Sequence, residues 1–267
     1  MLKSLKTQWL ILGHSRAFVI FFLLCCICIC LIPATVAFLS KDSGNSNNLY
    51  SIFEDAFIFP TVFNTVNILS KIAIIPMMSL LIIISICQEL DSKTYRLHLL
   101  SGSNRGELWR NSVLVILFLS FIVSLISYLS AFCIGLFDIK NAIQTKWILI
   151  CHWYVLLFIQ CVGYFSWATT FALLFRKIGL VLILYITWFL LIERGVAQIL
   201  NFNTVLELYP LSNMLPGKSL EGLTHLKIIE DYIHQASDYK NIQYIPAAAW
   251  CLTSNIVNYV LYRKTEY

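Results

Sequence analysis

Residues 112–137 read SVLVILFLSFIVSLISYLSAFCIGLF and contain no charged side chain. A helix needs about 20 predominantly apolar residues to cross the hydrocarbon core of a bilayer, and this stretch is longer than that. Similar runs recur along the chain, in which 59% of the 267 residues are hydrophobic and only 12% are charged. A water-soluble domain carries about 25% charged residues. The sequence therefore predicts an integral membrane protein.

The apolar runs on either side of this stretch predict an all-α polytopic membrane protein with six transmembrane helices. The expected spans are residues 17–39, 61–87, 112–137, 147–175, 178–200 and 244–262. No segment between them is large enough for a soluble domain, so we expect residues 1–267 to form a single transmembrane domain. Ahead of the first span, Leu2, Leu5, Trp9 and Leu12 recur at helical spacing, which predicts an N-terminal interfacial helix.

Lysine and arginine mark the cytoplasmic side of a membrane protein when its loops are short. On the side that we assign to the cytoplasm lie Lys3, Lys6, Arg16, Lys93, Arg96, Arg105, Arg110, Arg176, Lys177, Arg263 and Lys264. On the other side lie Lys41, Lys140, Lys146, Arg194, Lys218, Lys227 and Lys240. This bias predicts that both termini are cytoplasmic. The membrane that we expect is the bacterial cytoplasmic (inner) membrane. The net charge of +5 is explained by this topology, and we expect no nucleic-acid partner.

The sequence predicts no catalytic site, metal or cofactor of its own. Its nine cysteines all fall inside apolar runs. We expect them to be reduced thiols that fill space against lipid or neighbouring helices. The histidines are scattered, and there is no two-histidine zinc motif, no Gly-x-Ser-x-Gly elbow and no Gly-x-x-x-x-Gly-Lys phosphate loop. We therefore expect no enzyme activity, and any energy source must come from a partner.

The connection between the second and third spans, residues 88–110, reads QELDSKTYRLHLLSGSNRGELWR. It is longer than a hairpin between two helices requires. Its apolar residues are interspersed with charged ones, and this pattern predicts a short amphipathic helix on the inner membrane surface. They are Leu97, Leu99, Leu100, Leu108 and Trp109. A solvated basic loop is the alternative interpretation.

The order of residues in this connection resembles the signature of type 2 ATP-binding cassette (ABC) transporter permeases. That signature is an acidic, Gly-Thr, Leu-rich, Ser-Pro, Arg string between spans two and three. The matching residues are Glu89, Asp91, Thr94, Leu97, Leu99, Ser101, Arg105 and Glu107. Lys93, Gly102 and Ser112 stand where the family usually has Gly, Pro and Lys. Chain length, six spans, internal termini and the interfacial helix agree with the family over the full chain.

The resemblance implies that this segment is a cytoplasmic coupling helix that docks on a separate ABC ATPase subunit. It also implies ATP-driven movement of an unidentified substrate, usually export, with a second permease copy in a homodimer or heterodimer. The coupling residues would be Glu89, Asp91, Thr94, Arg96, Leu99, Leu100, Ser101, Arg105 and Glu107. Retention of the arginines at lipid headgroups is the alternative.

Polar residues at membrane depth predict a second site. Asn64, Asn67 and Lys71 share one face of the second span, and Glu193 lies in the outer-leaflet part of the fifth. They suggest a substrate path or a pair between Lys71 and Glu193. Alternatively, Lys71 snorkels outward and Glu193 marks an early helix end.

The external segment after the fifth span, residues 201–243, contains Pro210 and Pro216 and then an amphipathic pattern. It predicts an external cap that either gates exit or only seals the bundle. Two other functions stay open for the chain. One is an ion-gradient-driven transporter, and the other is a membrane enzyme or assembly factor.

Overall fold

The computed structural model describes residues 16–42, 61–91, 104–136, 147–202, 215–221 and 244–264. Within these ranges the chain is almost entirely helical and forms no strand. The helices are α2 (Arg16–Asp42), α4 (Thr61–Asp91), α6 (Arg105–Gly135), α8 (Trp147–Phe175), α9 (Ile178–Thr187), η2 (Trp188–Ile192), α10 (Glu193–Phe202), α11 (Pro216–Glu221) and α13 (Tyr244–Lys264). The expected interfacial helix at residues 2–12 lies outside the described residues.

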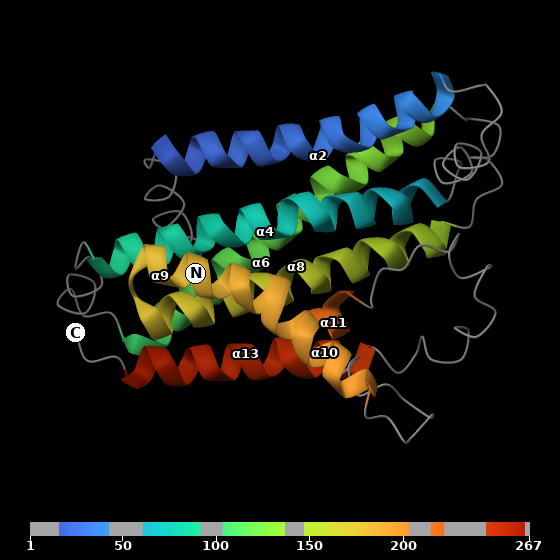
Figure 1. Cartoon of the computed structure of the whole chain (residues 1–267). Coiled ribbons are helices and arrows are strands. Elements are labelled where there is room, and N and C mark those ends of the chain that lie inside the picture. Colours follow the sequence, from blue (N-terminus) through green and yellow to red (C-terminus); the bar gives the residue numbers. More distant parts are fainter. Residues whose placement is uncertain are drawn as a thin grey trace.

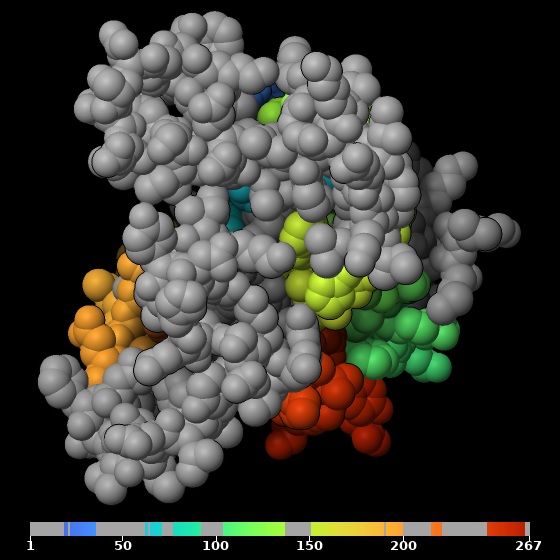
Figure 2. All heavy atoms as spheres, turned by 90° about the vertical axis from the view of Figure 1, so that its right-hand side faces the viewer, coloured from blue at the N-terminus to red at the C-terminus, as the bar shows by residue number. Residues whose placement is uncertain are grey.

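Helix α8 is the centre of the bundle. It contacts α4, α6, α9 and α13, and the long helices run roughly along one common direction (Figure 1). In the end-on view, atoms of α8 lie near the middle of the picture, with α13 below them and α10 to the left (Figure 2). Leu157, Phe165 and Leu173 of α8 are fully buried in the core. The other helices are therefore arranged around a helix that has little exposed surface.

Helix α6 has an apolar outer face and a small, polar inner face. The exposed side chains are Leu117, Phe121, Leu125 and Leu129, and the fully buried ones include Ser120, Ser124 and Ser127. A helix of a water-soluble protein has the opposite pattern. Small buried residues let helices approach closely where the hydrophobic effect does not drive them together, as in lipid. The pattern of α6 is thus typical of a helix that faces hydrocarbon.

Two of the described helices are long and apolar enough to cross a membrane: α6 over Arg105–Gly135 and α8 over Cys151–Phe175. Most of the α8 window is buried, whereas only about a third of the α6 window is. These two helices indicate association with a membrane. The expected helical runs that begin at residues 61, 147 and 244 are confirmed as helices, whereas the crossing of the membrane six times stays a prediction.

Basic residues gather where several helices begin or end, at one end of the bundle. The turn at Arg176 and Lys177 joins α8 to α9, and the start of α6 meets the last turn of α13. In Figure 1 the end of α4 and the start of α9 lie at this same left-hand end. We call it the basic end; its basic residues include Arg105, Arg110, Arg176, Lys177, Arg263 and Lys264.

Buried hydrogen bonds join α8 to α13. The amide of Asn258 donates to the carbonyl oxygen of Ser166 at 3.1 Å and accepts from the Thr170 hydroxyl at 2.8 Å. Asn255 donates to the Ser166 hydroxyl at 3.2 Å. We call these four residues the polar seam. Interhelical hydrogen bonds of this kind contribute about 0.6 kcal/mol each in a membrane.

The turn between α8 and α9 generates a stability prediction. Arg176 has a φ of 57°, in the left-handed region that favours glycine, and its N–H donates to the carbonyl of Ala172 at 3.0 Å. A Cβ atom in this conformation costs about 1–2 kcal/mol. We expect Arg176→Gly to be more stable than Arg176→Ala by about 1 kcal/mol in thermal unfolding of the purified protein. Both variants lack the guanidinium, so equal stability would contradict the prediction.

Candidate functional site

We call residues 89–107, which contain the predicted coupling residues, the coupling string. The structure describes only its two ends. Glu89 and Asp91 lie in the last turn of α4, and Arg105 and Glu107 lie in the first turn of α6. The remaining predicted coupling residues, Thr94, Arg96, Leu99, Leu100 and Ser101, lie outside the described residues. Both ends are continuous with long helices. The segment between the helices is therefore shorter than the connection at 88–110 that the sequence predicted.

Helix α6 begins earlier than its apolar run because the sequence caps it. Asn104 has extended backbone angles (φ −76°, ψ 147°), and its N–H donates to a carboxylate oxygen of Glu107 at 3.3 Å. This is half of a capping box, and the acidic side chain also suits the positive end of the helix dipole. Leu108 is buried and Trp109 half-buried, so the prediction that they lie on a separate amphipathic connection is wrong.

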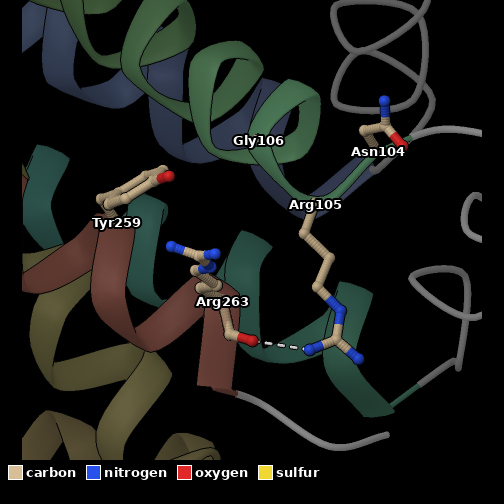
Figure 3. Close-up of a pocket in the computed structure, with 5 residues that line it drawn as sticks. All are labelled: Asn104, Arg105, Gly106, Tyr259 and Arg263. Atoms are coloured by element: carbon tan, nitrogen blue, oxygen red, sulfur yellow. Dashed lines mark hydrogen bonds between the residues drawn. The ribbon is translucent and has the colours of Figure 1, made fainter.

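Arg105 ties the start of α6 to the end of α13. Its guanidinium Nη1 donates to the carbonyl oxygen of Arg263 at 2.6 Å (Figure 3). One turn further into the bundle, the rings of Trp109 and Tyr259 meet edge to face with centroids 5.2 Å apart. The first two turns of α6 are therefore joined to the last turns of α13 by a hydrogen bond and a ring contact. The predicted contact of Arg105 with an ATPase stays a prediction.

The two acidic residues at the end of α4 differ in their surroundings. Asp91 is exposed, whereas Glu89 is half-buried, beyond the expected span, next to Leu90, which packs against the core. Burial raises the pKa of the Glu89 carboxyl to about 7, because removal from water disfavours the charged form. Glu89 thus changes charge near neutral pH, at the end of the helix that leads into the coupling string.

This pKa shift predicts a pH-dependent stability. The folded protein keeps the Glu89 proton above its ordinary pKa of 4.5, so the contribution of this group to stability falls as the pH rises from 4.5 to about 7. Above that range, folding must bury a charge. We expect Glu89→Gln to raise the unfolding temperature relative to wild type above pH 7, and the difference to disappear below pH 4.5. A difference that does not change with pH would contradict the prediction.

Glu193, the second predicted site residue, contacts the short helix α11. It follows the π-helical turn η2, is only 4% exposed, and accepts the backbone N–H of Lys218 at 2.7 Å. Asn67 contacts a different helix, since its amide donates to the carbonyl of Trp153 in α8 at 3.2 Å. The side chains of Asn64 and Lys71 lie outside the described residues, so the pairing of Lys71 with Glu193 stays a prediction.

Two glycines allow α11 to fit closely against its neighbours. A Cβ atom on Gly217 would overlap a carboxylate oxygen of Glu193 and lie 2.9 Å from the ring of Phe189. A Cβ atom on Gly163 of α8 would lie 2.6 Å from Leu220, which is fully buried. Helix α11, which we call the plug helix, thus packs against α8, α13 and the start of α10.

The sequence interpretation missed several of the buried polar groups and both of these glycines. Gln160 of α8 is fully buried, and neither atom of its amide has a hydrogen-bond partner among the residues that the structure describes. Its position inside an apolar run was a usable signal, the same one that singled out Asn67. Asn255 and Asn258 recur at helical spacing in the last span and could have been found in the same way. The glycines gave no such signal, because their role depends on the approach of a distant helix.

Comparison with known proteins leaves the function to be argued from the chain itself. No protein-family model matches the sequence, and a search of curated proteins finds no match. The two features that carry the argument are therefore the basic end of the bundle, with the ends of the coupling string, and the plug helix with Glu193.

The fit of the plug helix predicts the effect of two matched substitutions. Gly217→Ala would place a methyl group against Glu193 and Phe189, whereas Gly195→Ala in α10 would meet only open space. Overpacking of a core costs about 1–3 kcal/mol. We expect Gly217→Ala to lower the free energy of unfolding by this amount, measured by chemical denaturation in detergent, and Gly195→Ala to leave it unchanged or higher. Equal stabilities would show that α11 is not held against Glu193.

Proposed function

We propose that the chain is the membrane-spanning permease subunit of an ABC transporter. It crosses the membrane six times, with α2, α4, α6, α8, the α9–η2–α10 segment and α13 as spans, and both termini are cytoplasmic. It works with a second permease copy and exports an unidentified substrate. A separate ATPase subunit supplies the energy, so the chain needs no catalytic residue of its own.

The observation that carries this proposal is the arrangement around the coupling string. The string joins the end of α4 to the start of α6, and the start of α6 is fastened to α13 by Arg105 and by the contact between Trp109 and Tyr259. A displacement of the string by an ATPase would therefore move α6 and α13 together. Because α13 is joined to the central helix α8 by the polar seam, the displacement would reach the centre of the bundle.

Buried polar groups support a path for substrate inside the bundle. Asn67 and Ser70 of α4 and Gln160 of α8 are all buried. Within the described part of the chain, Ser70 and Gln160 have side-chain atoms without a hydrogen-bond partner. A buried polar group without a partner is costly in an apolar surrounding, and a substrate that passes through the bundle would supply one. In this proposal the plug helix and Glu193 close the outer end of the path. Movement of the plug helix would open an exit.

The proposal is tested by affinity purification of the full chain from its own host in mild detergent. We expect an ATPase subunit with a phosphate loop to copurify and to hydrolyse ATP. Asp91→Lys and Leu99→Asp, both in the string, should each reduce the recovered ATPase at least about tenfold, which corresponds to about 1.4 kcal/mol. The matched control is Arg194→Glu, which reverses a charge in α10 and should leave recovery unchanged.

Three results would contradict the proposal. Recovery of the same ATPase with wild type and with both string variants would remove the coupling role of the string. Transport by the chain in cells that lack the ATPase would favour an ion-gradient-driven transporter. Absence of any ATPase even after chemical cross-linking would favour a membrane enzyme or assembly factor.

A further inference from the structure

A cavity of about 370 Å³ opens at the basic end, between the first turn of α6 and the last turn of α13. It is lined by Asn104, Arg105, Gly106, Tyr259 and Arg263. Figure 3 shows the Tyr259 ring beside the guanidinium of Arg263, and the guanidinium of Arg105 directed toward the backbone carbonyl of Arg263. Two separate helices thus bring two cations and an aromatic hydroxyl to one cavity.

The cavity is electropositive, and its charges are available to a ligand. Arg105 uses one of its five N–H donors on the carbonyl of Arg263, and the remaining donors stay available. The same bond offsets the negative end of the α13 dipole, whereas the positive end of α6 faces the cavity. Among the residues that the structure describes, neither guanidinium has an acidic partner. The nearby carboxylate of Glu107 instead accepts the N–H of Asn104 at the cap of α6. An anion with several oxygen acceptors suits this arrangement.

An apolar stripe leads along α13 into the cavity. Leu252, Ile256, Tyr259 and Arg263 recur every three or four residues, so they share one face of the helix, and all of them are exposed. The contact between Tyr259 and Trp109 places aromatic rings where the apolar surface ends and the basic end begins. Aromatic residues at such a boundary are typical of the membrane interface. A ligand that covers both parts must be amphiphilic and anionic.

We propose that the cavity binds the phosphate of an anionic phospholipid, with an acyl chain along the stripe of α13. The phosphate oxygens accept hydrogen bonds from Arg105 and Arg263, and the hydroxyl of Tyr259 reaches the glycerol region. A basic pocket between helices at the cytoplasmic surface is a known type of site for anionic headgroups. This inference rests on membrane insertion, not on the ATPase, and it assigns Arg105 to lipid instead of to the coupling surface.

The test uses the full-length protein, delipidated in a neutral detergent, with bound lipid counted by native mass spectrometry during a titration. The probes are phosphatidylglycerol, phosphatidylcholine and inorganic phosphate. We expect wild type to bind phosphatidylglycerol most tightly of the three probes. Phosphatidylcholine should bind more weakly than phosphatidylglycerol, and inorganic phosphate at least about tenfold more weakly than phosphatidylglycerol. Equal affinity for phosphatidylglycerol and phosphatidylcholine would refute an anion site, and equal affinity for inorganic phosphate would refute the lipid.

Three variants locate the site. Arg263→Gln removes one cation, Gly106→Leu fills the cavity at a position where a Cβ atom meets only open space, and Ile256→Ser weakens the apolar stripe. Each should lower the affinity for phosphatidylglycerol about tenfold, which is the expected effect of losing one charge-assisted hydrogen bond or an equivalent contact. Gly195→Leu, also at an open glycine, is the matched control and should bind as wild type does. If Arg263→Gln and Gly106→Leu, measured as separate variants, both bind phosphatidylglycerol with wild-type affinity, the proposal is overturned.

The outcome is separable from that of the permease proposal. Lipid retention is measured without any ATPase, and the three variants leave Asp91 and Leu99 in place. Loss of lipid with intact recovery of the ATPase would support the lipid site alone. Loss of ATPase recovery in the string variants, with lipid retained, would support the permease proposal without bearing on the lipid site.

Discussion

The hydrogen bonds between Asn258 and helix α8 hold polar groups inside a bundle whose outer surface is largely hydrocarbon. The amide both donates to the Ser166 carbonyl and accepts from the Thr170 hydroxyl, so both of its polar atoms are satisfied. In an apolar surrounding no water is available to replace such partners. Close helix contacts must then depend on small residues and on polar pairs. The serines of α6 and the glycines around α11 are consequences of the same constraint.

The positions of the helices could be predicted because apolar runs of membrane-spanning length are a local property of the sequence. The runs expected from residues 147 and 244 begin where α8 and α13 begin. The start of α6 was predicted less well, since its apolar run begins at residue 112 but the helix already begins at Arg105. That extension depends on the contact between Asn104 and Glu107, a capping interaction that the search for apolar periods does not detect.

The partners of the polar residues could be predicted only in part. Asn67 and Glu193 were identified because polar groups are rare in apolar runs, and both are buried. The group that meets Glu193 is the backbone N–H of Lys218, and no pattern of side chains reports a backbone donor. The fit of Leu220 against Gly163 depends in the same way on how two helices meet in space. Sequence periodicity identifies faces, but the pairing of faces is decided by packing.

The π-helical turn between α9 and α10 has a consequence for how this chain can change. Such a turn contains one residue more than an α-helical turn, so the side chains after it are rotated by about 100° relative to a continuous α-helix. A deletion of one residue within Trp188–Ile192 could restore regular α-helix without interrupting the chain. The same deletion would rotate Glu193 away from Gly217 and bring a neighbouring side chain into its place. The length of this turn, as much as the carboxylate itself, decides which residue holds the plug helix.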